Sequence, residues 1–406
     1  MPSAGSSGHA PLDGLRRPGT LPRLLPGHPA AGPVGLAGHL ARYGPSPSAL
    51  GRQRRRELIA EVGRAGLTGR GGAGFPAAGK LAAVAAGRAP VVIANGTEGE
   101  PASAKDKVLM ARSPHLVIDG AVLAAELVGG RETMLVVHRR VREIMDEAAA
   151  ERRRAHLDRV KVTIRTAADR FAGGEASAVV HWIERGVPTP TAKPPRLSER
   201  GLGGRPTLVH NVETLAHLAL IARHGAPWFR SVGTSAEPGS MLVTVLGAVR
   251  EPCVLEIAIG TPVGQVLGLA GGPSVPLQAL LLGGYFGGWV KAADAADRPF
   301  SSAGLADLDA GTGAGLIAAL PADAGGIAET ARLVRYLAAE SAGQCGPCLF
   351  GLAAIAAELT RIAEGRTTEL GLLRRWLGQV DGRGGCAHPD GAVRLVRSAL
   401  RVFGDW

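Results

Sequence analysis

The spacing of apolar residues changes along the chain, and each spacing is typical of a different kind of element. Apolar runs at 91–94, 116–124 and 134–138 alternate with segments of helical spacing such as Val141 to Arg154. Strands that alternate with helices are typical of a parallel sheet covered by helices. We therefore expect an α/β domain over residues 53–237.

A strand-like period of two appears next, and a helical period follows it. The runs Leu242 to Leu246 and Cys253 to Ile257 predict a small β domain over 238–295, with a connector rich in Ala, Gly and Asp over 296–326. Residues 327–406 predict a helical bundle, because four segments have helical spacing: 327–339, 349–363, 369–380 and 392–402.

Residues 1–52 have no regular period. They are rich in Gly, Pro, Ser and Ala, so we expect a flexible extension or a strap over the first domain. The net charge of +11 is concentrated here, since residues 1–60 hold eight arginines against two carboxylates. No basic motif interleaved with aromatic residues accompanies it, so we expect no nucleic-acid partner.

Composition limits the cellular setting. The chain has 406 residues, 46% of them hydrophobic, which is enough for several buried cores. No run of 18 apolar residues and no hydrophobic leader is present, so we expect a cytoplasmic protein that meets a membrane only through its partners. In a reducing compartment, four cysteines indicate metal or redox chemistry rather than disulfides.

A glycine-rich loop is the first candidate site. Gly69, Gly71, Gly72 and Gly74 leave backbone N–H groups free to bind a phosphate, while Arg70 and Lys80 add charge and Phe75 adds a flat apolar face. The pattern fits the dinucleotide fingerprint, but a helix rather than a strand leads into it. A surface turn therefore stays an alternative.

Polar residues at strand ends and helix starts form the second group. Asn95, Glu98 and Glu100 follow a buried strand, where open α/β sheets bind ligands. Glu175 and Asn211 with Thr214 each open a helix, and each motif by itself is equally typical of an ordinary helix cap.

Cysteines form the third group. Cys345-Gly-Pro-Cys348 has the spacing of a thioredoxin-type dithiol, although a helix rather than a strand precedes it. Cys386 lies further on, and Cys253 is expected to be a buried apolar residue. Three unliganded thiols are the alternative to a metal site.

These motifs, in this order, resemble the NADH-binding flavoprotein subunit of respiratory complex I and its relatives in NAD-linked hydrogenases and formate dehydrogenases. The resemblance runs from about residue 58 to the C-terminus. It implies a Rossmann-like FMN-binding α/β domain, a β-grasp (SLBB-like) domain and a C-terminal four-helix iron–sulfur bundle. It also implies FMN, NADH and an iron–sulfur cluster as cofactors.

The resemblance assigns roles to the candidate residues. It places the FMN phosphate and ribityl chain on the glycine-rich loop with Arg70, Lys80, Asn211 and Thr214, and the flavin beside Asn95 and Glu98. It places the nucleotide beside Phe75, Glu100, Glu175 and Lys193, with Glu98 and Glu100 as the catalytic pair, and the cluster on Cys345, Cys348 and Cys386.

Several positions depart from the family pattern. Ala342 stands where the first cluster cysteine belongs, so the cluster is expected to have four irons with a non-cysteine cap, to have three irons, or to be lost. Ser341 and His388 are nearby substitutes. Around the nucleotide, Ala176 replaces a second glutamate and Arg196 an aromatic residue. A third departure around the nucleotide is Thr97 in place of an acidic residue, and His210 replaces an asparagine in the motif that holds the flavin phosphate.

We therefore expect an electron-transfer flavoprotein that oxidises NADH through FMN and passes electrons toward an iron–sulfur centre and a ferredoxin-like or other redox partner subunit. Two alternatives stay open. One is a flavin-linked dithiol reductase that uses Cys345 and Cys348, and the other is a non-catalytic assembly subunit that retains the fold. The choice between NADH and NADPH is left open by the sequence.

Overall fold

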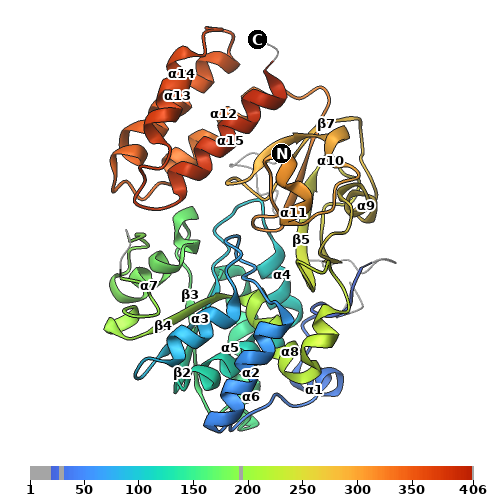
Figure 1. The fold of residues 1–406 in the computed structure, drawn as a ribbon, viewed down its shortest axis with the longest axis vertical. Coiled ribbons are helices and arrows are strands. Elements are labelled where there is room, and N and C mark those ends of the chain that lie inside the picture. Colours follow the sequence, from blue (N-terminus) through green and yellow to red (C-terminus); the bar gives the residue numbers. More distant parts are fainter. Residues whose placement is uncertain (1–19, 27–31, 192–194, 405–406) are drawn as a thin grey trace.

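The computed structural model describes residues 20–26, 32–191 and 195–404. Figure 1 shows an α/β body at the bottom, a mixed sheet at the upper right and a helical bundle at the top. The three bodies meet near the centre of the molecule.

The α/β body contains a four-stranded parallel sheet in the order β3-β2-β1-β4. Its strands are β1 (Val91–Gly96), β2 (Glu132–Val137), β3 (Lys161–Thr166) and β4 (Thr207–Asn211). Residues 91–94 are all buried, because helices cover both faces of the sheet. Asn95 pairs in register with Asn211, so the two residues lie together at the carboxyl ends of adjacent strands.

Helices enclose this sheet: α2 (Arg52–Ala65), α3 (Ala77–Ala85), α4 (Lys105–Arg112), α5 (Pro114–Val128), α6 (Arg142–Arg154), α7 (Ala176–Arg185) and α8 (Val212–Arg230). The apolar run 116–124, predicted to be a strand, lies instead in α5. Every residue of α5 is buried, so the helix has no polar face that could reveal its period. A Cβ atom at Gly120 would lie 2.0 Å from the carbonyl oxygen of Leu215, so glycine is required where α5 crosses α8.

The second body is a five-stranded mixed sheet in the order β6-β5-β9-β7-β8. Its strands are β5 (Ser240–Gly247), β6 (Cys253–Ala258), β7 (Leu277–Leu282), β8 (Gly288–Lys291) and β9 (Leu316–Pro321), and its helices include α9 (Val263–Leu269), α10 (Ala292–Ala295) and α11 (Ser302–Leu305). The central strand β9 comes from segment 296–326, which the sequence predicts as a connector. Its Ala-containing core has no clear strand propensity, and only its position between β5 and β7 buries it.

The bundle consists of α12 (Gly326–Ala339), α13 (Leu352–Ala363), α14 (Gly371–Val380) and α15 (His388–Phe403). A turn of π-helix, Pro347–Gly351, leads into α13. All four predicted helices are present, but α15 begins at His388 rather than Ala392. Ser398 on α15 accepts the amide hydrogen of Trp289 in β8 at 2.9 Å, which joins the bundle to the sheet.

The described part of the N-terminal segment forms a strap and a helix rather than a flexible extension. The helix is α1 (Leu36–Tyr43), and its His39 bonds Asp119 on α5 at 2.8 Å. The strap, residues 20–26, crosses from the α/β body to the mixed sheet. Leu24 is fully buried, and its amide donates to the Glu256 carboxylate at 2.7 Å.

Among the described residues, no single helix is long and apolar enough to cross a membrane. The helices α4 and α5 meet the requirement for length and composition only as a pair bent by 99°.

The carboxyl group of Glu256, which is buried beneath the strap, should make the free energy of unfolding depend on pH. Burial raises the pKa of Glu256 to about 7, above its usual value of about 4.3 in an unfolded chain. The folded protein therefore binds this proton more tightly, so the stabilisation is complete below about pH 4 and is lost as the pH rises through about 7. Between pH 5 and pH 8 the free energy of unfolding of the wild type should fall by up to about 3 kcal/mol on account of Glu256. In Glu256→Gln this contribution should be absent, because glutamine does not titrate.

Urea unfolding across this pH range measures the effect, with the exposed Glu57→Gln as the matched control. The wild-type curve includes other buried acids, so the difference between the wild type and the variant is the relevant quantity. Parallel pH curves for wild type and Glu256→Gln would contradict the assignment.

Candidate functional site

The candidate site begins at the carboxyl ends of β1 and β4. The Asn211 side chain accepts the amide hydrogen of Glu213 at 2.9 Å, which caps α8, and donates to Asp106 at 2.6 Å. The Asn95 amide donates to the carbonyl of Gly174 at 2.9 Å, which holds the Gly-Gly-Glu turn beside the strand end. Four segments that are distant in sequence therefore meet at one edge of the sheet.

The glycine-rich loop lies against this edge. A Cβ atom at Gly71 would lie 3.4 Å from the Cβ of Asn211, so the loop backbone approaches the strand end closely. Gly72 and Gly74 have φ angles of +102° and +64°, which L side chains rarely adopt. The Arg70 amide donates to the Thr214 hydroxyl at 2.8 Å, which anchors the loop on α8. The resulting arch exposes its glycine backbone, as an anion-binding loop requires.

Two cations flank the loop. The Arg70 guanidinium donates to Thr68 at 3.1 Å, while its Nε is buried without a partner, and burial lowers its pKa. Lys80 donates to the carbonyl of Val209 at 3.3 Å and lies 5.9 Å from the centre of the Phe75 ring. The Phe75 side chain is 57% exposed, so an apolar face is available beside the positive charge.

A cavity of about 490 Å³ opens on the other side of the loop, between the three bodies. It is lined by the glycine-rich loop, by Arg70 and Lys105, and by the segment 309–313 with Phe286 and Arg394. Of the described residues, neither Asn95 nor Lys80 lines it. The cavity therefore includes the glycine-rich loop and Arg70 but not Lys80 or the carboxyl ends of β1 and β4, where Asn95 and Asn211 form the strand-end crevice.

A buried ionic network of Lys105, Asp106 and Glu213 lies next to the strand-end crevice. It has no role among those predicted from the sequence. The Lys105 ammonium lies 2.7 Å from Asp106 and 2.8 Å from Glu213, and all three side chains are at least 95% buried. Burial alone would lower the pKa of Lys105, but the two carboxylates raise it. Asp106 also accepts from Asn211, so the network fixes that side chain. In the sequence, Lys105 and Asp106 belong to the motifs that carry the family resemblance, and Glu213 lies within the Asn211–Thr214 motif.

Glu98 turns toward α4 rather than into open space. Its carboxylate accepts the amide hydrogens of Asp106 at 3.0 Å and Lys107 at 2.9 Å, and it forms an ion pair with the Lys107 ammonium at 2.8 Å. Burial would raise its pKa, but Lys107 and Lys105 outweigh burial and lower it. Glu98 therefore caps α4 as a carboxylate. Both of its oxygens already have partners, so neither is free for the expected catalytic role.

Glu100 joins the α/β body to the mixed sheet. One carboxylate oxygen accepts the amide hydrogen of Tyr285 at 2.9 Å, whereas the other, Oε1, is buried without a partner. Burial raises the pKa of Glu100 to about 7. Its carboxyl group can therefore hold or release a proton near neutral pH.

The remaining positions expected near the nucleotide lie around helix α7 and the segment that follows it. The Glu175 carboxylate accepts the amide hydrogen of Ser177 at 2.8 Å and so caps α7. Ala176 begins α7, and Arg196 is exposed. Lys193 lies outside the described residues.

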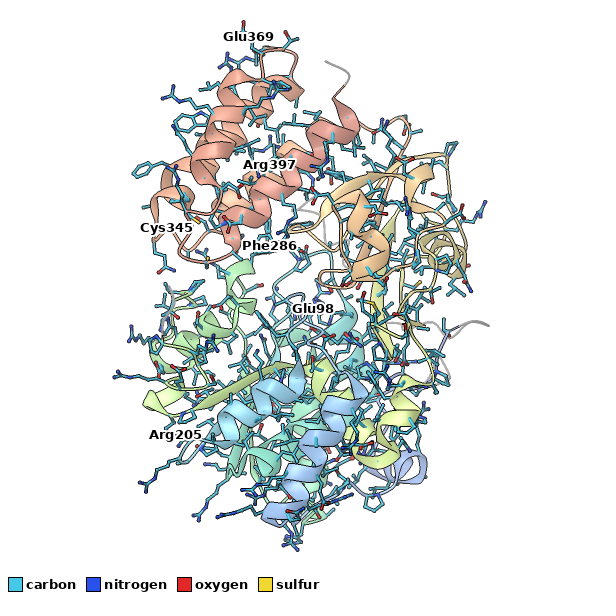
Figure 2. All side chains as sticks on the ribbon, in the orientation of Figure 1. Glu98, Arg205, Phe286, Cys345, Glu369 and Arg397 are labelled. Atoms are coloured by element: carbon cyan, nitrogen blue, oxygen red, sulfur yellow. The ribbon has the colours of Figure 1, made fainter. Side chains whose placement is uncertain are left out.

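The cysteines lie at the end of the bundle that faces the α/β body, where Figure 2 shows Cys345 above the level of Phe286 and Glu98. Cys345 and Cys348 share a thiol hydrogen bond, and Cys386 interacts electrostatically with both. Among the described residues, however, no group of three or more His, Cys, Asp or Glu side chains is arranged to hold a metal ion. Cys253 is fully buried in β6, as expected for an apolar residue.

An aromatic cluster fills the junction between these cysteines and Glu100. It consists of Phe171, Tyr285, Phe286, Tyr336 and His388, whose ring centres lie 4.9–6.3 Å apart in the contacting pairs. These five rings come from all three bodies. The His388 Nε2 bonds the carbonyl oxygen of Leu337 at 2.8 Å, so this ring is held within the cluster.

Three family models match the chain in the expected order. The Nuo51 FMN-binding domain matches residues 62–220, the SLBB domain matches 242–284, and the NADH-ubiquinone oxidoreductase-F iron-sulfur binding region matches 328–406. These matches fall on the α/β body, the mixed sheet and the bundle, and they confirm the predicted fold class.

A solved chain has the same fold. The NAD+-reducing NiFe-hydrogenase in the H2-reduced state superposes with a TM-score of 0.81 at 31% identity. The match covers 87% of this chain but only 62% of the hydrogenase chain, so this chain is similar to part of that protein.

Curated relatives match over most of their length. One of them, the first of two F subunits of the NADH-quinone oxidoreductases of Rhizobium meliloti, is 30% identical over 368 residues, which cover 85% of this chain and 84% of the relative. The F subunit of the Salmonella typhimurium NADH-quinone oxidoreductase is 29% identical over 375 residues, which cover 86% and 82%. Identity of this extent across nearly all of both chains confirms the resemblance, and the protein belongs to the family of NADH-quinone oxidoreductase F subunits.

Proposed function

We propose that this chain is the NADH-oxidising flavoprotein component of a larger redox enzyme, with FMN bound at the carboxyl ends of β1 and β4. The observation that carries the proposal is the convergence of the glycine-rich loop, Asn95 and Asn211 at one edge of a parallel sheet. Ligands of open α/β sheets bind in this position.

The residues present fit FMN. The exposed glycine backbone with Lys80 suits a phosphate, and the unpartnered Arg70 Nε is a further buried donor close to the loop. Asn95 and Asn211 fix the two strand ends beside the loop through their own hydrogen bonds, and Phe75 offers an exposed ring to the nucleotide. When bound, FMN accepts a hydride and releases electrons one at a time.

Glu100 is our candidate for proton transfer. Reduction of a flavin by hydride also takes up a proton, and the unpartnered Glu100 Oε1 is a buried position that can hold one near neutral pH. Glu98 has a positioning role. Its carboxylate fixes the start of α4, and so fixes Asp106, which in turn holds Asn211.

The bundle is the proposed exit for electrons. The aromatic cluster lies between Glu100 and the cysteines, where its rings join the three bodies. A ferredoxin-like or other redox partner would accept electrons at the bundle, and any attachment to a membrane would come from such partners. The Rhizobium meliloti and Salmonella typhimurium relatives are named as subunits of NADH-quinone oxidoreductases, which supports this arrangement.

The first test of FMN binding is the yellow colour of the purified chain. Lys80→Ala should weaken FMN binding by about 10- to 100-fold, because a charge-assisted hydrogen bond contributes roughly 1.5–3 kcal/mol. Gly72→Val should have a similar effect, since valine strains a backbone with a φ of +102°. Flavin absorbance per chain after dialysis measures both.

Two matched controls accompany these variants. Lys161→Ala removes an exposed lysine on β3, and Gly79→Ala changes a helical glycine with no atom within 4 Å of the new Cβ. Both should keep normal flavin content. Full flavin content in Lys80→Ala and Gly72→Val would exclude the loop as the phosphate site.

The proton-transfer role predicts a pH profile. Below about pH 7 Glu100 is protonated, so the rate of flavin reduction by NADH should be highest there and fall as the pH rises through about 7. Glu100→Gln keeps an acceptor for the Tyr285 amide but cannot donate a proton, so the rate at pH 6 should fall about tenfold or more. Anaerobic stopped-flow absorbance measures this. An unchanged profile in Glu100→Gln, with the exposed Glu369→Gln as control, would exclude Glu100.

Nucleotide affinity gives a separate test. Ala176 and Arg196 each remove a contact to adenosine that is worth about 1 kcal/mol, so NADH should bind weakly. Ala176→Glu combined with Arg196→Phe should lower the apparent Kd for NADH by about tenfold or more. If the double variant leaves the Kd unchanged, the donor is another protein or a different nucleotide.

A further inference from the structure

A short 3₁₀ turn, Phe171–Gly174, leads into α7 and lies against the strand-end crevice. Its Gly174 carbonyl accepts the side-chain amide of Asn95 at 2.9 Å. A Cβ atom at Gly99 would lie 2.5 Å from the carbonyl oxygen of Phe171, so the turn packs directly on the loop between β1 and α4. The position of the turn therefore determines the shape of the crevice on this side.

The first amide of this turn obtains its acceptor from the bundle. The first N–H groups of a helical turn have no partner within it, and the side chain of Arg170, which precedes the turn, does not cap it. Glu340 follows α12, and its carboxylate accepts the amide hydrogen of Phe171 at 2.9 Å. The Glu340 side chain is only 21% exposed, so the surrounding protein partly shields this hydrogen bond from water. The bundle thus caps a turn that belongs to another body.

A second contact holds the far end of the same segment. The Gln344 side chain donates to the carbonyl of Pro190, which follows α7. Residues 340–344 of the bundle therefore bond both to the start of the turn and to the chain beyond α7. Figure 1 shows α7 beneath the bundle, in agreement with these contacts.

The other parts of the crevice are fixed within the α/β body. The glycine-rich loop is anchored on Thr214, and Asn211 is held by Asp106. The Asn95 side chain accepts from both the amide and the hydroxyl of Thr97, at 3.2 and 2.8 Å, so it keeps its place without the turn. Loss of the Glu340 contact should therefore displace the turn and leave the flavin side of the crevice intact.

We infer that Glu340 is a positioning residue for NADH: from the bundle it caps the turn Phe171–Gly174 and holds this wall of the crevice in place for the nucleotide. It acts through the backbone of Phe171 rather than by contact with the nucleotide. The inference rests on the proposed function in that NADH binds beside this turn. It makes nucleotide affinity depend on how the bundle is seated on the α/β body.

The test compares Glu340→Ala with Glu340→Gln. Alanine leaves the Phe171 amide without its acceptor, so the apparent Kd for NADH should rise about tenfold. Glutamine keeps a carbonyl oxygen that can accept this hydrogen, so its Kd should stay within about threefold of the wild-type value. Anaerobic bleaching of the flavin at a series of NADH concentrations gives the Kd and the limiting rate. The limiting rate and the flavin content should change less than about twofold in both variants.

Two variants separate the hydrogen bond from charge. Arg170→Ala removes an ion pair whose atoms lie 3.9 Å apart at the surface, and such pairs contribute little, so its Kd should change less than about twofold. Glu364→Ala removes an exposed carboxylate elsewhere on the bundle and should behave as the wild type does.

Hydrogen exchange tests the contact without any cofactor. Exchange at the Phe171 amide should be about tenfold faster or more in Glu340→Ala than in the wild type, and Glu340→Gln should restore most of the protection. Mass spectrometry of peptides that cover residues 170–178 measures this.

Three outcomes would overturn the inference: a wild-type Kd in Glu340→Ala, unchanged exchange at Phe171, or an equal rise in Kd in Glu340→Ala and Glu340→Gln. A fall in flavin content that matches the rise in Kd would overturn it too, because the flavin side would then depend on Glu340. Wild type that binds no flavin would instead contradict the proposed function, and exchange at Phe171 would still decide whether Glu340 holds the turn.

Discussion

The pairing of Lys105 with Asp106 and Glu213 is the constraint on which the site depends. All three charges are buried, and a buried charge that loses its partner destabilises a protein by several kcal/mol, roughly 3–5. Asp106 holds Asn211 at the strand end, and the second oxygen of Glu213 accepts the amide hydrogen of Leu242 at 2.8 Å. One ammonium group therefore connects the crevice, two helices and the first strand of the mixed sheet.

The loop between β1 and α4 carries two carboxylates with different partners. Glu98 caps α4 within the α/β body, while Glu100 accepts the amide hydrogen of Tyr285 in the mixed sheet. Tyr285 belongs to the aromatic cluster, which also contacts the bundle through Tyr336. A single short loop thus links the strand-end crevice to the bundle through residues in direct contact.

The substitutions in this chain are not spread evenly over the site. Asn95, Asn211 and the glycine-rich loop keep the family pattern. Ala176, Arg196 and Thr97 depart from it where the resemblance implies the nucleotide, and His210 departs from it in the motif expected to hold the flavin phosphate. Ala342 stands where the resemblance implies a cluster cysteine. Four of these five departures therefore fall at positions expected to contact the nucleotide or the cluster, and one falls in the motif expected to hold the flavin.

Local period and spacing were enough to predict β1, the four bundle helices and the loops of the crevice, because each is encoded within a few neighbouring residues. They failed for α5 and for β9, since burial on all sides removes the polar face that marks a period. They left open whether Glu175 caps a helix or binds a ligand, and they did not show that Glu98 caps a helix or that Glu100 has a buried free oxygen. A carboxylate acquires its partners and its pKa from residues brought near it in space, and only the tertiary structure decides which these are.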